Sequence, residues 1–157
     1  MSPPSCGVWN HRFNLDGFLV YGSHEKCNSY IQYFRSGGVE LYTTRLYDSG
    51  NERNPPKLRV NDVEKVAVKY IEKLFTFLSE LRVEPPLIIY LSIMDLKNVV
   101  VIDGKFDRDE ILFPGSIVDN LDIDISELLH LNFDILWQAA GLNESPNYKD
   151  GIWTLRE

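Results

Sequence analysis

Residues 61–82 read NDVEKVAVKYIEKLFTFLSELR and carry the clearest structural pattern in the sequence. Apolar residues recur there at spacings of three and four, a period that places them on one stripe of a helix. The pattern therefore predicts a helix over 61–82 whose stripe packs in the core. Asn61 is predicted to cap the first turn, with Glu64 three residues later in a variant of the capping box. Pro85-Pro86 ends this helix.

Strand and turn patterns flank the helix on both sides. Before it, residues 12–21 (RFNLDGFLVY) contain Asp16-Gly17, which indicates a bulge or a tight hairpin, and residues 29–47 form a hairpin around Ser36-Gly37-Gly38. After it come predicted strands at 87–94 (LIIYLSIM), 99–102 and 111–113. A second helix follows from Asp124, capped by Asp124 or Ser126, and Gly141 stops it. This order predicts an α+β fold: one antiparallel sheet of five to six strands (meander, helix, hairpin, helix) with two helices packed on one face.

Length and composition indicate one globular domain. The chain has 157 residues, of which 44% are hydrophobic and 25% charged, close to the globular average. We expect a flexible tail over 1–10, rich in Pro and Ser, and a single domain over 11–157. The longest apolar run is about half a membrane span, no signal peptide is recognisable, and two cysteines are too few for a disulfide framework. These features predict a cytoplasmic protein with no membrane association.

The net charge of −7 is divided unevenly along the chain. Residues 1–73 carry ten basic and eight acidic side chains, whereas residues 74–157 carry six and fifteen. Because affinity for nucleic acid comes largely from contacts of cations with phosphates, the second half disfavours direct nucleic-acid binding. A weak basic surface in the first half is kept as an alternative, through Arg45, Arg53, Lys57, Arg59, Lys65, Lys69 and Lys73.

No arrangement of residues typical of an active site is recognisable, so we expect no catalytic residues, no metal and no cofactor. One enzyme alternative is a divalent-metal nuclease or phosphoesterase, because Asp95 followed by Asp103-x-Lys105 echoes the acidic residues and lysine of such sites. A zinc site is also conceivable from the C-x4-H-x12-H-x2-C set. However, an extended strand between its two ligand pairs would separate them by roughly 30 Å. That set is Cys6, His11, His24 and Cys27.

Several segments together resemble one family. An N-x-D-G strand, a Y-x-Q-x-F-R-x-G-x-x-E hairpin, an R-D-x-x-x-x-P segment and a closing F-D-x-x-W-x-A-A-G occur in order from about Arg12 to Trp153. They resemble the C-terminal region of prokaryotic DNA-binding proteins of the Schlafen/AlbA type, often labelled helix-turn-helix domain proteins. The matching positions are Asn14, Asp16, Gly17, Tyr30, Gln32, Phe34, Arg35, Gly37, Glu40, Arg108, Asp109, Pro114, Phe133, Asp134, Trp137, Ala139, Ala140 and Gly141.

The resemblance implies a module without the family's N-terminal DNA-binding domain. We therefore expect a non-catalytic accessory or regulatory module for ligand sensing, partner docking or oligomerisation, whose partner is an absent or separate DNA-binding or effector domain. Exposed β-edges also leave a homodimer open. The candidate binding residues lie on the first strands and the last helix, and the alternative is that they form a buried hydrogen-bonded network that fixes the fold. They are Asn14, Asp16, Gln32, Arg35, Glu40 and Trp137.

Overall fold

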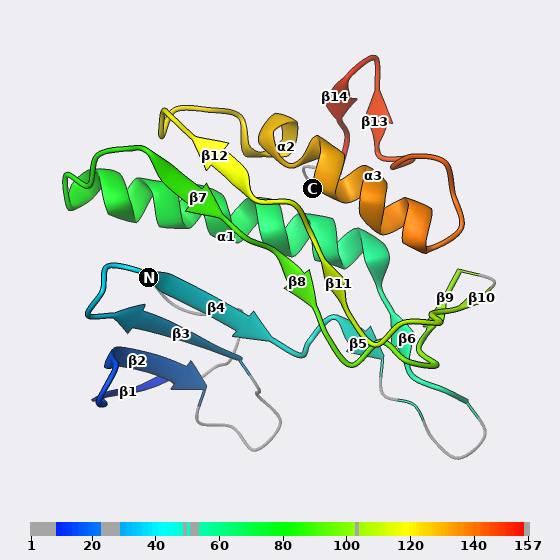
Figure 1. Ribbon diagram of the computed structural model, residues 1–157, viewed down its shortest axis with the longest axis horizontal. Coiled ribbons are helices and arrows are strands. Elements are labelled where there is room, and N and C mark those ends of the chain that lie inside the picture. The colour runs from blue at the N-terminus through cyan, green and yellow to red at the C-terminus, as the bar shows by residue number, and fades with distance from the viewer. Residues whose placement is uncertain (1–8, 23–28, 49, 51–53, 103, 156–157) are drawn as a thin grey trace. The chain divides into compact units, whose positions relative to one another are not determined.

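The computed structural model describes residues 9–22, 29–48, 50, 54–102 and 104–155, and it has the α+β fold that the sequence predicts (Figure 1). The chain divides into two compact units, Met1–Tyr47 and Asp48–Glu157, where the sequence predicted a single domain over 11–157. The described strands before Tyr47 pair with their neighbours in the sequence, and the single domain stays a prediction.

The first unit is a four-stranded antiparallel meander. Its strands are β1 (Trp9–Phe13), β2 (Gly17–Gly22), β3 (Ser29–Phe34) and β4 (Val39–Thr43), paired in that order. Both predicted hairpins are confirmed, and the first is a tight turn at 14–16 rather than a bulge. Because β1 begins at Trp9, the predicted tail over 1–10 includes two residues of a strand, while residues 1–8 lie outside the described residues.

The helices lie in the second unit. They are α1 (Val60–Glu80), α2 (Ile125–Leu128) and α3 (His130–Ala139). The side chain of Asp124 accepts the N–H groups of Ser126 and Glu127, which confirms the predicted cap of α2. The capping box predicted for α1 is wrong: Arg59 is the N-cap residue and forms no side-chain cap. Glu64 does not reach back toward the helix start, because it is fully buried and accepts hydrogen bonds from distant residues.

The remaining strands form several small sheets rather than continuing the meander, so the predicted single sheet of five to six strands is divided. The segment LIIYLSIM is split into β7 (Leu87–Ile89) and β8 (Ser92–Ile93), which pair with β12 (Ser116–Val118) and β11 (Ile111–Leu112). A second sheet has the order β10-β9-β6-β5, and β13 pairs with β14. The bounds of these last strands are Gly104–Lys105 (β10), Val100–Val101 (β9), Lys57–Leu58 (β6), Tyr47–Asp48 (β5), Tyr148–Lys149 (β13) and Ile152–Trp153 (β14).

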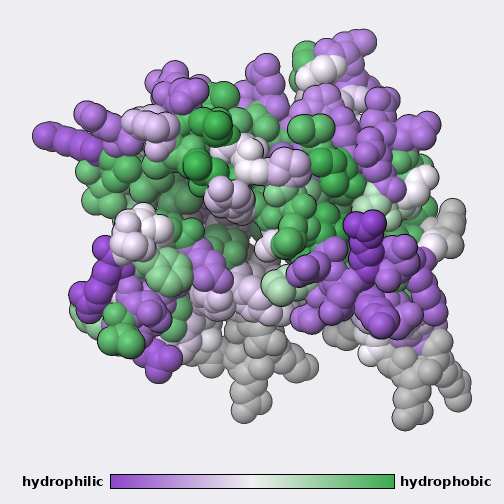
Figure 2. All heavy atoms as spheres, viewed as in Figure 1, coloured by the Kyte–Doolittle hydropathy of each residue, from purple (hydrophilic) through white to green (hydrophobic). Residues whose placement is uncertain are grey.

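The core of the second unit lies between α1, the paired strands β7 and β12, and α2 and α3. Phe75 of α1 packs there with Val118 of β12, Leu129 between α2 and α3, and Phe133 of α3. The predicted apolar stripe of the long helix is confirmed in part: Val63, Tyr70 and Ile71 are buried, whereas Leu81, just after the helix, is 59% exposed. Figure 2 also shows hydrophobic side chains on the outer surface, in the region where Figure 1 places β7 and β12. None of the described helices combines the length and the apolar composition needed to cross a membrane.

Candidate ligand-binding site

One face of the meander carries a row of tyrosines across its strands. Tyr21 of β2 is paired with Tyr30 of β3, which is in turn paired with Tyr42 of β4. Because successive side chains of a strand point to opposite faces, residues directly paired across strands share a face. On the same face, Arg12 is paired with Leu19, one row from the tyrosines.

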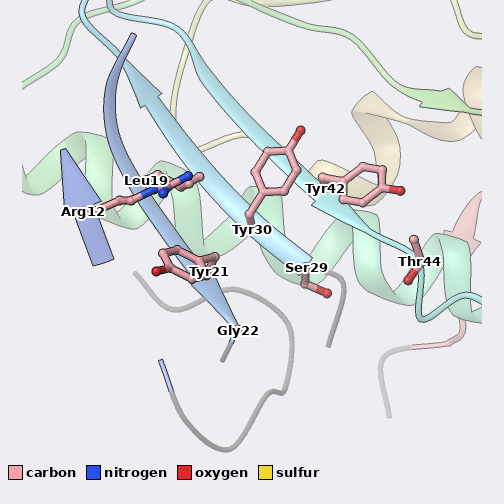
Figure 3. A pocket seen from close by; sticks show the side chains of 8 residues that line it. All are labelled: Arg12, Leu19, Tyr21, Gly22, Ser29, Tyr30, Tyr42 and Thr44. Atoms are coloured by element: carbon pink, nitrogen blue, oxygen red, sulfur yellow. The ribbon is translucent and has the colours of Figure 1, made fainter. Parts of the chain in front are cut away.

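These side chains surround an open hollow of about 440 Å³ (Figure 3). Its volume is within the range of sites for small molecules. Figure 3 shows Arg12 and Tyr21 on one side of it and the rings of Tyr30 and Tyr42 on the other. Its lining consists of Arg12, Leu19, Tyr21, Gly22, Ser29, Tyr30, Tyr42 and Thr44.

Contacts between the side chains fix both walls of the hollow. The rings of Tyr30 and Tyr42 are stacked, with centroids 5.1 Å apart and planes inclined by 22°. On the other wall, the guanidinium carbon of Arg12 lies 5.7 Å from the centroid of the Tyr21 ring, within cation–π distance. The hollow therefore presents two aromatic walls and one cation before any ligand arrives.

A carboxylate holds the inner tyrosine in place. The hydroxyl of Tyr30 donates a hydrogen bond to Oε1 of Glu40 over 2.7 Å. Burial, and then the hydrogen bond and charge of Glu40, raise the pKa of Tyr30 from its ordinary 10.0 to about 12. Tyr30 therefore stays protonated at neutral pH, and Glu40 fixes the direction of its hydroxyl.

The structure brings together part of the site that the sequence predicted. Nδ2 of Asn14 donates to Oε1 of Gln32 over 2.7 Å, and Oδ1 of Asn14 accepts the N–H of Gly17 over 2.8 Å. Gln32 is 5% exposed and lies on the tyrosine face, paired with Glu40. Asn14 and Gln32 thus form the kind of network that holds a fold together, here at the β1–β2 turn, while Glu40 lies beside the hollow.

The other predicted residues lie elsewhere. Asp16 and Arg35 meet through their backbones, since the N–H of Arg35 donates to the carbonyl of Asp16 over 2.8 Å. The side chain of Arg35 is exposed and donates to the carbonyl of Leu15 over 3.3 Å. Neither residue lines the hollow.

Trp137 belongs to a different cluster, inside the second unit. Its Nε1 donates to Oε1 of Glu64 over 2.5 Å. The hydroxyl of Ser145 donates to the same oxygen over 2.8 Å, and Nε1 of Trp153 donates to Oε2 over 2.7 Å. All four side chains are buried, so this cluster is internal and Trp137 is not available to a ligand at the sheet.

Sequence reasoning missed the residues that line the hollow. It placed Arg12 and the tyrosines within the predicted strand and hairpin segments, 12–21 and 29–47, and it included none of them among the candidate binding residues. The turn at Gly37 offered part of the signal, because it sets the pairing of Tyr30 with Tyr42. The pairing of Tyr21 with Tyr30 lies between β2 and β3, where no glycine turn sets the register.

The enzyme and zinc alternatives gain no support from the described residues. In that part of the chain, no group of three or more His, Cys, Asp or Glu side chains could hold a metal ion. Asp95 is an exposed residue after β8 with a φ of 59°, and Lys105 is exposed on β10. Asp103, Cys6, His24 and Cys27 lie outside the described residues.

Comparisons with protein families, with curated proteins and with solved structures found no match to this chain. The resemblance to the Schlafen/AlbA type therefore stays a prediction.

Proposed function

We propose that this protein is a non-catalytic ligand-binding module, and that the tyrosine-walled hollow of the meander binds a small anion that carries a flat ring. The observation that carries the proposal is the placement of Arg12 over Tyr21, opposite the stacked pair of Tyr30 and Tyr42. A flat ring can stack on aromatic walls, and a guanidinium pairs with carboxylate or phosphate.

The chemistry of the lining supports binding rather than catalysis. Of the eight described residues that line the hollow, none is His, Cys, Asp, Glu or Lys, which leaves tyrosine as the general acid or base type present. The pKa of Tyr30 is raised to about 12, away from the neutral range that suits proton transfer. The hydroxyl of Ser29 is already hydrogen-bonded to that of Thr43, 2.9 Å away. What the hollow offers a ligand is therefore ring faces, hydroxyl groups and one positive charge.

Charge supports an anionic ligand of small size. Residues 1–47 carry four basic and three acidic side chains, so the unit that holds the hollow is almost neutral. A long polyanion would need many cations along its path, whereas a single anionic group needs only Arg12. Ligand sensing on behalf of a separate DNA-binding or effector domain, as the Schlafen/AlbA resemblance implies, is part of this proposal.

Calorimetric titration of the full chain with AMP and with nicotinate tests the proposal, because both are flat-ring anions. Adenosine, which has the ring but no anionic group, and inorganic phosphate, which is an anion without a ring, serve as comparison ligands. We expect at least one ring anion to bind more tightly than either comparison ligand. Arg12→Gln and Tyr42→Leu should each weaken that binding about tenfold, the effect of removing one well-placed contact.

Two variants outside the hollow provide the matched controls. Lys69→Gln removes an exposed cation from α1, and Tyr90→Leu removes an exposed tyrosine from the second unit, so both should leave the affinity unchanged. The proposal fails if neither ring anion binds at about 1 mM, the weak end of specific affinity. It also fails if the control variants weaken binding as much as Arg12→Gln does.

A further inference from the structure

The paired strands β7–β8 and β11–β12 form a ribbon with two apolar faces. The inner face is core: Val118 is 0% exposed and Ile93 is 8% exposed. The outer face also consists largely of apolar side chains, and these are exposed to solvent. Their exposed fractions are 57% for Ile88, 74% for Tyr90, 59% for Met94, 68% for Leu112 and 63% for Ile117.

The outer face is a defined surface rather than scattered side chains. Ile88 and Ile117 are directly paired across β7 and β12. Tyr90 lies against Gly115: a Cβ placed on that glycine would come within 2.8 Å of the tyrosine ring and 3.4 Å of the Ile88 side chain. The glycine therefore leaves room for the ring, and Ile88, Tyr90 and Ile117 form one continuous apolar strip. We call this strip the ribbon face.

The sequence of the ribbon is typical of strands covered on both sides. A strand with one solvated face alternates apolar and polar residues, whereas LIIYLSIM (87–94) is almost uninterrupted apolar sequence. One side of the ribbon packs against α1, α2 and α3 through the core cluster. The ribbon face is the opposite side, and its apolar side chains are exposed to solvent. A contiguous exposed apolar surface of this kind marks an interaction site.

The charge of the residues around the ribbon face is mainly negative, which favours a positively charged partner. Residues 84–119 carry seven acidic and three basic side chains, and residues 48–157 carry twenty and twelve. Exposed carboxylates lie beyond both ends of the ribbon, with Glu84 and Asp119 next to β7 and β12 and Asp95 and Glu110 next to β8 and β11. A second copy stacked on this face would bring carboxylates together, and the same charge repels nucleic acid and anionic lipid.

We propose that the ribbon face docks a basic protein partner, which covers Ile88, Tyr90 and Ile117 with an apolar strip and places Lys or Arg side chains next to the flanking carboxylates. Apolar contact supplies the buried centre of such an interface, and complementary charge at its rim steers association. This interface uses none of the residues that line the hollow.

A defined probe tests the inference on the full chain: a fluorescent ten-residue peptide that alternates valine with lysine. Its counterpart, alternating valine with glutamate, has the same apolar strip and the opposite charge. We expect the protein to raise the fluorescence anisotropy of the lysine peptide and not that of the glutamate peptide. The affinity for the lysine peptide should fall as salt is raised from about 50 to 200 mM. Ile117→Lys should weaken its binding at least about tenfold, since it places a cation in the centre of the strip.

Matched variants separate docking from folding. Ile117 is mostly exposed, so Ile117→Lys should leave the melting temperature unchanged, and Tyr90→Ser offers a second, uncharged disruption of the ribbon face. Tyr42→Leu, in the hollow, should leave peptide binding intact. Equal binding of the two peptides would overturn the choice of a basic partner. The absence of lysine-peptide binding at about 1 mM would overturn the docking site itself. Self-association of the chain that Ile117→Lys abolishes would assign the ribbon face to a second copy instead.

Discussion

Each unit of the molecule buries a polar side chain, and the two do so over very different distances in sequence. In the first unit, Gln32 of β3 bonds to Asn14 of the β1–β2 turn, 18 residues away. In the second unit, Glu64 accepts hydrogen bonds from Trp137, Ser145 and Trp153, which are 73, 81 and 89 residues away. The meander is thus organised by local turns. In the second unit, the carboxylate of Glu64 instead connects α1 to the C-terminal part of the chain through hydrogen bonds.

The largest effect is expected at the carboxylate. Glu64→Ala would leave three buried donors without an acceptor and open a cavity, so we expect the free energy of unfolding to fall by about 3–5 kcal/mol. Urea denaturation measures this loss. Glu72→Ala, at an exposed position of the same helix, is the matched control and should change stability by less than about 0.5 kcal/mol. Equal losses in the two variants would show that Glu64 does not organise the unit.

In the meander, we expect the largest loss of stability from a substitution next to a turn, at Gly17, rather than from the loss of a polar side chain. Gly17 has a φ of 152°, and a Cβ there would lie 2.0 Å from the carbonyl oxygen of Tyr33. Because that contact is with backbone, Gly17→Ala should cost about 2–3 kcal/mol, less than Glu64→Ala, since the strands can shift apart.

The matched control for this turn is Gly37→Ala. Gly37 also has a positive φ, 92°, but apart from its neighbours in the chain no atom lies within 4 Å of the place that an added Cβ would occupy. Only the backbone strain of about 1 kcal/mol therefore applies there. Urea denaturation of both variants would contradict the steric argument if their losses were equal.

The smallest expected effect is on the free energy of unfolding at alkaline pH, and it concerns one tyrosine from each unit, Tyr30 and Tyr148. Burial raises the pKa of Tyr30 to about 12, with Glu40 as a further cause. Burial also raises the pKa of Tyr148, with further contributions from Glu64, Asp134 and Asp124. Both folded-state pKa values exceed the unfolded value of 10.0, so the stabilisation is complete below pH 10 and is lost as pH rises through the folded values.

The free energy of unfolding should therefore fall above pH 10, and Tyr148→Phe should make that fall shallower. Tyr30→Phe should do so only up to about pH 12, where the folded tyrosine itself ionises. Urea denaturation at a series of pH values, with tyrosinate absorbance as the second readout, measures both slopes. A profile that neither variant changes would rule out these tyrosines as the cause.

Patterns confined to short segments were readable from the sequence. The three-and-four spacing of residues 61–82 predicted α1, and the glycine turns predicted the hairpins of the meander. Of the two caps predicted for the second helix, Asp124 and Ser126, the structure has Asp124. The prediction that Glu64 belongs to a capping box was wrong, because the local sequence from Asn61 to Glu64 is compatible both with a capping box and with a buried hydrogen-bond acceptor. Their difference lies in Trp137 and Trp153, which no local pattern connects to α1.

The candidate hollow shows the same division. The sequence supplied Tyr21, Tyr30 and Tyr42 and the turns between their strands, but their shared face follows only from the pairing register. Nothing in the spacing of Arg12 indicated that its guanidinium would lie over Tyr21.

By itself, the sequence determined the long helix, the glycine turns of the meander and the charge asymmetry, because hydrophobic period, turn residues and charge act over a few residues or add along the chain. Tertiary structure alone decided three things: the separation into two units, the burial of Glu64 among donors from the far end of the chain, and the exposure of one face of an apolar ribbon. Each of these depends on which distant segments meet, and hydrogen-bond geometry and packing settle that only once the chain has folded.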